Sequence, residues 1–344
     1  MKILSIDTSC DETAAAVTED IKILSNTIWS QASLHAKFGG VMPSLAQRMH
    51  KERIDWVVDK ALQSSKTEIR DLDAIAVTIG PGLSIALGVG IDKAKELAKK
   101  YNKKLIAVNH LEGHILSPLA KSKSLQTDVN YPALGLVISG GNTMLVKINK
   151  IGEYKVLAQT TDDALGEALD KSARMLGLGY PGGAILEKLA RGGNISTYTL
   201  PVPISGQEDR KIFTYSGLKT AIMRLIEKEK EKNENLSKQK ISDLAACFQD
   251  AAFTHLTRVI SYIIRNSEYG VDTLLVGGGV SANTELRKRL RNIGKQFNIK
   301  VLFPYSKRLT GDNAAMIGIA AYFKAQRGEF AKMDNIDRDP RAKL

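Results

Sequence analysis

Two histidines four residues apart are the first feature of the sequence that could carry chemistry. His110 and His114 stand in the stretch NHLEGH. On a helix this spacing places both imidazoles on one face, which is a common way for a helix to supply two metal ligands. Glu112 lies two residues from each histidine and so points away from that face. This argues against a HExxH peptidase, where the acid beside the first histidine is the general base. A pair of surface or helix-cap histidines is the alternative.

A third metal ligand must come from elsewhere in the chain, and a carboxylate is the expected type. Asp312, in the stretch LTGDNAAMIGIAA, is a candidate because it directly precedes a helix of small residues. A carboxylate in that position could instead cap the start of the helix. The sequence leaves both roles open.

Two neighbouring acids follow the first apolar run of the chain. Asp11 and Glu12 stand in DTSCDET, where a turn is expected to face a cleft. Carboxylates repel a triphosphate unless a metal intervenes, so a phosphate-gripping turn of a kinase would favour glycines and hydroxyls here. These acids suit an incoming amine or a metal, and a solvated turn with capping acids is the alternative.

The turn in ISGGNT could present its backbone to an anion. Gly140 and Gly141, after Ser139, permit positive φ and let N–H groups approach a ligand without an intervening Cβ. An ordinary hairpin turn is the alternative. Further along, Gly183 opens a helix that carries Glu187, a carboxylate that could receive ribose hydroxyls; there the alternative is a plain helix start after Pro181.

Three glycines in LLVGGGVSANTELRKRL lie between a predicted strand and a predicted basic helix. Their spacing excludes both a dinucleotide-binding GxGxxG and a P-loop. Glycines at such a corner suit a flat base lying on the backbone, and Asn283 is expected to be free to bond the base or the sugar. The basic helix, Arg287 to Arg291, is either a contact for nucleic acid or solvated surface.

Composition narrows the class of protein. The 344 residues carry a net charge of +12, which favours a polyanionic partner or simply keeps the surface soluble. Two cysteines, Cys10 and Cys247, are too few for a disulfide framework and indicate a reducing compartment. The sequence lacks an apolar run of the roughly 18 to 20 residues that span a bilayer, and a signal-peptide pattern. We therefore expect a cytoplasmic protein without a membrane partner.

The elements that must position these residues alternate along the chain. Apolar runs predict strands, and amphipathic stretches predict helices, which together indicate an α/β protein. The stretches KILSIDTS and LGLVISGGNT share one shape, a strand, a small-polar turn and another strand, which suggests two duplicated lobes with a cleft between them. The polar segment 122–132 is the expected boundary. The predicted strands are 2–7, 74–80, 104–110, 134–141, 143–148, 272–279 and 300–304, and the predicted helices are 45–65, 88–101, 167–178 and 241–266.

Taken together, the chain closely resembles the TsaD family of tRNA N6-adenosine threonylcarbamoyltransferases, once labelled sialoglycoprotein endopeptidases. The matching stretches recur in family order over nearly the whole chain, with weak matches around 190–210 and 226–240. They are ILSIDTSCDET, SQASLHAKFGGVMPSLAQRMH, IAVTIGPGLSIALGVGI, VNHLEGHILSP, LVISGGNTMLV, TTDDALGEALDKSARMLGLGYPGG, FTYSGLKTAI, LLVGGGVSANTELR and LTGDNAAMI.

The resemblance implies a fold and an activity. The fold is that of the actin-like ATPases (ASKHA), with an N-terminal lobe of residues 1–130, a C-terminal lobe of residues 131–344, and a last helix, about 312–328, that packs back on the first lobe. The activity is transfer of the threonylcarbamoyl group from threonylcarbamoyl-AMP to N6 of adenosine 37 in tRNAs that read ANN codons, with release of AMP.

The resemblance also implies roles for single residues. Asp11 and Glu12 would be the acids near the acceptor amine. One divalent metal per subunit, Fe2+ with Zn2+ or Mg2+ as alternatives, would be held by His110, His114 and Asp312. The phosphate and acyl end of the intermediate would lie on Val137, Ile138, Ser139, Gly140 and Gly141, and the ribose and adenine on Asp170, Gly183, Glu187 and Asn283.

The implied partners are the anticodon stem-loop of tRNA, a degenerate paralogue of the same fold (TsaB-like) and a small ATPase (TsaE-like), with a homodimer as the alternative. Two positions depart from the family pattern: Asn142 follows SGG where many bacterial members have His, and Ser44 replaces a usual Glu. Other functions that the sequence leaves open are a metallopeptidase, a sugar-kinase-like phosphotransferase and a non-catalytic scaffold.

Overall fold

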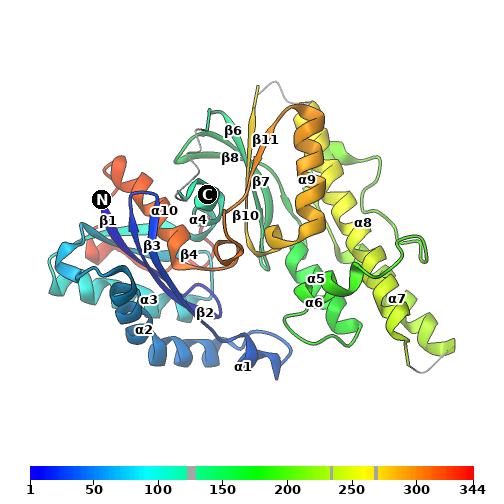
Figure 1. The fold of residues 1–344 in the computed structure, drawn as a ribbon, viewed down its shortest axis with the longest axis horizontal. Coiled ribbons are helices and arrows are strands. Elements are labelled where there is room, and N and C mark those ends of the chain that lie inside the picture. The colour runs from blue at the N-terminus through cyan, green and yellow to red at the C-terminus, as the bar shows by residue number, and fades with distance from the viewer. Residues whose placement is uncertain (122–128, 233–234, 267–269) are drawn as a thin grey trace.

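The computed structural model describes residues 1–344 except 122–128, 233–234 and 267–269. Its first sheet has the strand order β3-β2-β1-β4-β5 (Figure 1). The antiparallel pairs β1–β2 and β2–β3 form one half, and β4 and β5 add in parallel to β1. The strands are Lys2–Asp7 (β1), Glu12–Glu19 (β2), Lys22–Ser30 (β3), Ala74–Gly80 (β4) and Lys104–Asn109 (β5).

The second sheet repeats this plan with the order β11-β10-β6-β7-β8-β9. Strands β6, β7 and β8 form the antiparallel half, while β10 and β11 continue in parallel from β6. Strand β9 is an addition at the far edge, parallel to β8. The repeat of one strand order confirms the duplicated α/β architecture. The strands are Ala133–Ile138 (β6), Thr143–Lys150 (β7), Glu153–Thr160 (β8), Ile212–Phe213 (β9), Thr273–Gly277 (β10) and Lys300–Leu302 (β11).

Helices cover the two sheets, and α4 lies between them (Figure 1). The α-helices are Ala32–Ala36 (α1), Pro43–Ser65 (α2), Ser84–Lys100 (α3), His110–Leu116 (α4), Leu165–Met175 (α5), Gly183–Ala190 (α6), Ser216–Lys232 (α7), Lys238–Arg265 (α8), Thr284–Phe297 (α9) and Ala314–Gln326 (α10). Short 3-10 helices are Ile69–Asp71, Ser117–Leu119, Glu208–Arg210, Gly279–Ala282, Lys307–Leu309 and Met333–Asn335. None of the helices in the described part of the chain is long and apolar enough to cross a bilayer.

Each strand and helix predicted from the sequence is present, with ends shifted by a few residues. The prediction gave no range to β2, β3, β8 or β9. Of these, β2 is the strand expected after the KILSIDTS turn, and its core is the run Ala14–Ala15–Ala16. Alanine is a strong helix former, but these residues are fully buried in the middle of the first sheet, where packing overrides propensity. The predicted boundary segment 122–132 lies partly outside the described residues, and a lobe division at residue 130 stays a prediction.

Helix α10 returns to the first sheet near its start. The hydroxyl of Ser5 in β1 donates a hydrogen bond to the carbonyl of Ala314 at 2.6 Å, and both residues are buried. A Cβ at Gly318 would come within 2.7 Å of Thr18 in β2, so glycine lets the helix lie close to the strand. The start of α10, with Asp312 just before it, is thereby fixed against β1 and β2.

Helix α4 approaches the second sheet just as closely. A Cβ on Gly277, the last residue of β10, would collide with the backbone carbonyl of His114. Glycine is therefore required where α4 crosses β10. This contact sets the position of both histidines relative to the cleft.

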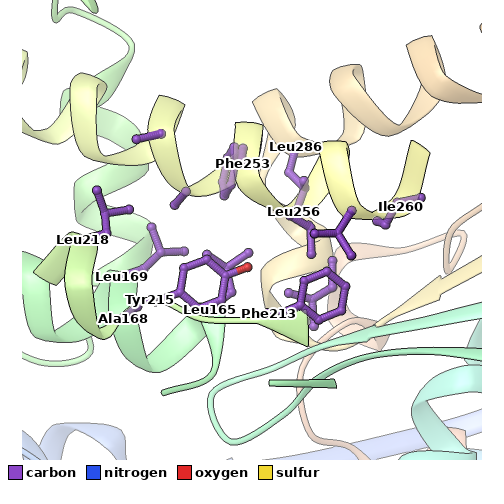
Figure 2. Close-up of a cluster of buried hydrophobic side chains, with 14 of the residues drawn as sticks. Leu165, Ala168, Leu169, Phe213, Tyr215, Leu218, Phe253, Leu256, Ile260 and Leu286 are labelled. Atoms are coloured by element: carbon purple, nitrogen blue, oxygen red, sulfur yellow. The ribbon is translucent and has the colours of Figure 1, made fainter. Parts of the chain in front are cut away.

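The core of the second lobe gathers side chains from α5, α7, α8, α9 and β9 (Figure 2). His255 of α8 is buried beside Phe213 and Tyr215, with ring centroids 6.2 and 5.4 Å away. Its Nε2 accepts the N–H of Thr214 at 3.1 Å. Burial lowers the pKa of His255 to about 4, so the folded core holds a neutral imidazole.

Replacing Gly277 with alanine tests the α4–β10 contact. We expect Gly277→Ala to lower the free energy of unfolding by about 1–3 kcal/mol, the usual cost of an overpacked core, because α4 must shift. Urea unfolding measures this. Gly141→Ala is the control, since a Cβ there meets open space. Equal stability of both variants would contradict the required close approach.

His255 makes a pH dependence testable. Its pKa is near 6.5 in the unfolded chain and about 4 in the fold, so stability is full above pH 6.5 and falls as the pH drops toward 4. One pKa unit corresponds to about 1.4 kcal/mol, which gives a loss of about 3 kcal/mol. Unfolding free energies measured from pH 7 to 4 should fall less steeply in His255→Gln. Parallel curves for the two proteins would show that His255 does not titrate in this way.

Candidate active site

The two histidines are placed by the junction between β5 and α4. The strand ends at Asn109, whose Oδ1 accepts the N–H groups of Leu111 and Glu112 at 2.8 and 3.3 Å. This cap begins α4 at His110. His110 and His114 then stand one turn apart with ring centroids 4.7 Å apart, which confirms the predicted common face.

Asp312 completes the cluster from the other side. Its Oδ1 lies 3.4 Å from Nε2 of His110 and 3.2 Å from Nε2 of His114. The cap of α10 is the next residue, Asn313, whose Oδ1 accepts the N–H of Met316 at 3.1 Å. The capping alternative for Asp312 is therefore wrong, and its carboxylate is directed at the imidazoles.

The chemistry of this cluster fits a cation. One ligand atom from each of the three residues can be chosen so that all lie within 4.8 Å of one another. Both histidines are buried, and among the described residues Nδ1 of His110 and both ring nitrogens of His114 have no hydrogen-bond partner. A buried nitrogen without a partner is costly, and a metal ion beside Asp312 would pair Nε2 of His114, the nitrogen that faces this carboxylate. The three residues could hold a divalent metal.

The charges of Asp312 and His114 support the same conclusion. Burial alone would lower the pKa of His110, but the carboxylates of Asp312 and Asp7 raise it to about 10, so a metal would have to replace a proton on that imidazole. Burial alone would raise the pKa of Asp312, but the neighbouring imidazoles hold it well below its ordinary value. Burial lowers the pKa of His114, which favours the neutral imidazole that binds metals. An ionised carboxylate beside a neutral imidazole is a donor set that binds divalent cations.

Asp7 is a site residue that the sequence analysis missed. It ends β1, is 1% exposed, and its Oδ2 lies 3.6 Å from Nδ1 of His110. A carboxylate on the far nitrogen of a ligating histidine orients the ring. The available signal was an acid at the end of the otherwise apolar run KILSID, since a buried charge needs a partner.

A cavity of about 620 Å³ opens beside this cluster and contains most of the predicted residues. Asp11, Glu12, His110, Asp312 and the turn 139–142 all line it. The Ser30 hydroxyl donates to Oε1 of Glu12 at 3.1 Å. Burial, with the charges of Asp11 and Asp312, raises the pKa of Glu12 well above its ordinary value. Asp11 and Glu12 of the first lobe therefore line the cavity beside the cluster of His110, His114 and Asp312, which we call the metal-type cluster.

The 139–142 turn is closed by its own hydrogen bonds and leaves room for a ligand at its two glycines. Ser139 N–H donates to the carbonyl of Asn142 at 2.8 Å, and Asn142 N–H to Oγ of Ser139 at 3.1 Å. Gly140 and Gly141 do not use the positive φ that glycine permits. A Cβ on either would meet no atom within 4 Å. The glycines serve by leaving the cavity wall open.

Val137 and Ile138 occupy a different environment from the turn. Both belong to β6 and are fully buried, Val137 in the core beside α4 and Ile138 in the core of the second lobe. Their side chains do not line the described cavities. Any contribution from these two residues to a ligand would come through the backbone.

A second cavity of about 240 Å³ adjoins the first. The two share Gly140, Asp170, Pro181 and Gly279 as lining residues, so they lie side by side. The remaining predicted nucleotide ligands, Gly183, Glu187 and Asn283, line the smaller cavity. The structure thus brings all of the predicted ribose and adenine ligands together.

These ligands also hold the protein together. Oδ1 of Asp170 accepts the N–H groups of Gly182 and Gly183 at 2.9 and 2.7 Å, at the start of α6. Oε1 of Glu187 accepts the N–H and hydroxyl of Thr284 at 3.0 and 2.7 Å. Within the described chain, the second oxygen of each carboxylate has no hydrogen-bond partner.

Asn283 departs from the expectation of a free side chain. Its Oδ1 accepts the N–H of Leu286 at 3.1 Å and so caps α9, while its Nδ2 donates to Gln249 at 2.9 Å. Both polar atoms of the amide are therefore bonded within the protein: the oxygen caps α9, and the nitrogen is bonded to Gln249. The prediction that this side chain is free to bond a base or sugar was wrong.

The three glycines of this corner have different roles. Gly277 makes room for α4, and Gly278, with φ of 92°, lies where a Cβ would collide with the backbone of Ile138. Gly279 lines both cavities. Of this triplet, Gly279 therefore faces the cavities, and the other two glycines allow close packing.

The basic helix after the corner, α9, is partly committed to the fold. Arg289 forms ion pairs with Asp250 and Glu285. Arg287 and Arg291 both lie over the ring of Phe303, at 4.7 and 5.5 Å. These contacts favour a structural role for the arginines nearest the corner.

Glu112 points away from the metal-type face, as the spacing predicted. Its Oε1 accepts the hydroxyl of Tyr154 at 2.9 Å and lies 3.8 Å from Arg327. It is not among the residues that line the cavity. The general-base arrangement of a HExxH peptidase is therefore not formed.

Other residues that line the large cavity were not predicted. Lys171, Arg174 and Tyr180 contribute to its wall. Arg174 follows Asp170 by four residues on α5, so helical spacing could have placed both on one face. Of the two departures from the family pattern, Asn142 lines the cavity and Ser44 is exposed on the first turn of α2.

Two duplicated sheets with a metal-type cluster in the cavity beside them define a protein of the actin-like ATPase fold. Solved structures of that fold agree. Full-length HypF, in its phosphate- and nucleotide-bound form, aligns with a TM-score of 0.57 at 13% identity over 95% of this chain and 55% of its own. ROK hexokinase from Thermus thermophilus aligns with a TM-score of 0.50 at 12% identity over 95% of this chain and 100% of its own.

Sequence relatives narrow this class to one family. The family profile described as tRNA N6-adenosine threonylcarbamoyltransferase (TsaD) matches residues 22–319. Proteins of that name from Clostridium novyi (strain NT) and Thermodesulfovibrio yellowstonii are 43% and 44% identical, over 100% and 97% of this chain and 98% and 97% of their own lengths. The chain belongs to the tRNA N6-adenosine threonylcarbamoyltransferase family.

Removing one histidine tests the cluster as a metal site. We expect His114→Gln to lose most of the divalent metal that the unaltered protein retains, because two ligands hold a cation far less well than three. Metal per chain is measured by inductively coupled plasma mass spectrometry. Glu112→Gln is the matched control on the same helix and should keep its metal. Full retention in His114→Gln would place the metal elsewhere.

Proposed function

We propose that this protein transfers the threonylcarbamoyl group of threonylcarbamoyl-AMP to N6 of adenosine 37 in tRNAs that read ANN codons. In this reaction the bond from the carbonyl carbon to the phosphate oxygen breaks and a bond from that carbon to N6 forms. A proton leaves N6, and AMP is released. Membership of the family supports threonylcarbamoyladenosine as the product, and the shape of the two cavities supports threonylcarbamoyl-AMP as the donor.

The observation that carries this proposal is the pair of adjoining cavities. The larger one contains the first-lobe acids, the metal-type cluster and the open glycine turn. The smaller one continues from it and is lined by Glu187 and Gly279. An acyl-adenylate needs such a division, with its nucleoside in one compartment and its reactive carbonyl in the other.

Glu12 is suited to accept the proton of the acceptor amine. An exocyclic adenine amine is a poor nucleophile and gains from a base within reach. Burial raises the pKa of Glu12, so its ionised carboxylate is a stronger base than an exposed one. Asp11, beside it on the cavity wall, contributes to that shift.

The ribose and phosphate of the donor have matching groups. The unpaired oxygens of Asp170 and Glu187 can accept ribose hydroxyls, while their bonded oxygens keep the carboxylates in place. The turn 139–142 gives the phosphate and acyl end open space at the cavity wall. Asn283 contributes by fixing the corner of the pocket.

His110, His114 and Asp312 would hold the metal. Two imidazoles and one carboxylate form the donor set of many Fe2+ sites, which supports iron, and Zn2+ accepts the same ligands. When bound, a divalent cation supplies Lewis-acid polarisation of a phosphoryl or carbonyl oxygen. Asp7 would orient His110.

The remaining assignments rest on the resemblance. We propose the anticodon stem-loop as the recognised part of tRNA, a TsaB-like paralogue and a TsaE-like ATPase as partners, lobes that divide near residue 130, and action in the cytoplasm. The net charge of +12 supports an RNA partner. A peptidase is disfavoured by the position of Glu112, and a sugar kinase by Asp11 and Glu12 in the cavity.

Reconstitution tests the proposal. The protein, threonylcarbamoyl-AMP and an unmodified tRNA transcript, with and without bacterial partner proteins, should yield threonylcarbamoyladenosine by nucleoside mass spectrometry. We expect Glu12→Gln to slow the reaction about a hundredfold, because it removes the base. Glu227→Gln, an exposed acid on α7, is the control. Absence of the product with partners present would overturn the proposal.

A further inference from the structure

The segment 31–42, which we call the strap, connects β3 to α2 and contains the short helix α1. In Figure 1 it extends from the first sheet toward α6 of the second lobe. Gly39 and Gly40 of the strap line the large cavity. The strap therefore forms part of the rim of the proposed active site, although it carries none of the residues assigned above.

Buried polar side chains hold the near end of the strap. Gln31, His35 and His50 are all fully buried. Nδ1 of His35 accepts the N–H of Met42 at 3.2 Å, so its Nε2 carries the proton and donates to Oε1 of Gln31 at 3.1 Å. The two ends of the strap are thereby joined through one imidazole.

The same network reaches the acidic turn. Nε2 of His50 lies 3.0 Å from the carbonyl of Cys10, to which it must donate, and its Nδ1 then accepts the hydroxyl of Thr13 at 2.8 Å. Cys10 and Thr13 flank Asp11 and Glu12 in the chain. The N–H of Gln31 at the start of the strap donates to the carbonyl of Asp11 at 3.0 Å, so the strap is joined directly to the acidic turn that His50 holds.

The far side of the strap is held by the second lobe. Arg174 of α5 donates a hydrogen bond to the carbonyl of Gly39 at 2.8 Å. Gly39 has φ of 68°, a conformation that glycine adopts without strain. The tip of the strap is thus fixed from both lobes at the mouth of the cavity.

Phe38 stands next to this fixed glycine and faces solvent. Its exposed fraction is 60%, and that of Met42 at the end of the strap is 42%. A single exposed apolar residue is common on protein surfaces. Here, however, the backbone beside Phe38 is fixed by the buried contacts of the strap and by the second lobe. The exposed ring is therefore preorganised to contact a ligand.

We propose that Phe38 stacks on an unpaired base next to the acceptor adenosine of the RNA substrate. This inference rests on the proposed function. An adenosine that enters the cavity leaves the stack of its loop, so a neighbouring base loses a stacking partner, and an aromatic side chain can replace it. Exposed Lys37 beside Phe38, and Arg174, which donates to the carbonyl of the next residue, Gly39, suit the adjacent phosphates. These cations favour RNA over a protein partner at this site.

Steady-state kinetics with an anticodon stem-loop RNA test the proposal. We expect Phe38→Ala to raise KM for the RNA about tenfold, as loss of one stacked base does, with little change in kcat and in KM for threonylcarbamoyl-AMP. Phe38→Trp should restore KM, because any aromatic ring can stack. The matched control is Trp56→Ala, which removes another exposed aromatic, on α2, that lines neither cavity.

A spectroscopic measurement makes the test specific for stacking. The probe is the stem-loop with 2-aminopurine at the nucleotide on either side of adenosine 37. Its fluorescence should be quenched on binding to the unaltered protein and to Phe38→Trp, and less so with Phe38→Ala. If Phe38→Ala gives an unchanged KM and the same quenching, the proposal is wrong. Unchanged RNA kinetics with weaker assembly with a partner protein would assign Phe38 to that protein instead. Failure of the unaltered protein to form product would count against the proposed function and not against stacking, which the fluorescence reports separately.

Discussion

The close approach of α4 to β10 is the constraint on which the rest of the site depends. Because residue 277 has no side chain, the carbonyl of His114 can lie where a Cβ would otherwise be. The helix then presents both imidazoles to the side where α10 begins. Since α10 is itself fixed to β1 through Ser5, Asp312 reaches the histidines from the first sheet while α4 is held by the second. The metal-type cluster is thus a meeting point of the two halves of the fold.

Asparagine caps make that meeting point available for chemistry. At the start of α4, α9 and α10 an asparagine bonds the first free N–H groups. Because Asn313 caps α10, the carboxylate of Asp312 is not used by the helix and can face the cavity. The same arrangement removes Asn283 from the ligands, because its amide is used by the helix and by Gln249. One type of local interaction therefore decides which polar side chains reach the cleft.

The sequence predicts those features that depend on local spacing. The common face of His110 and His114 follows from helical periodicity, and the duplicated plan follows from two similar strand-turn-strand stretches. Features that depend on tertiary contacts escaped prediction. The bounds of β2 were not predicted because its alanines favour a helix. Asp7 gains its role only when β1 meets α4, and the hydrogen bond of Asn283 to Gln249 joins residues 34 apart in the chain. The Gly277 contact likewise involves a helix far away in sequence, so the glycine run alone could not separate packing from binding.

The carboxylates of the smaller cavity show why structural and binding roles can coincide. Asp170 and Glu187 each use one oxygen to fix a backbone turn, and this holds the other oxygen in a defined direction. A ligand that bonds the second oxygen then loses little further side-chain entropy on binding. The same logic applies to the strap, where buried histidines fix the backbone beside an exposed ring. In both places the fold has already ordered the groups that would meet a substrate, which is the condition for converting weak single contacts into specific recognition.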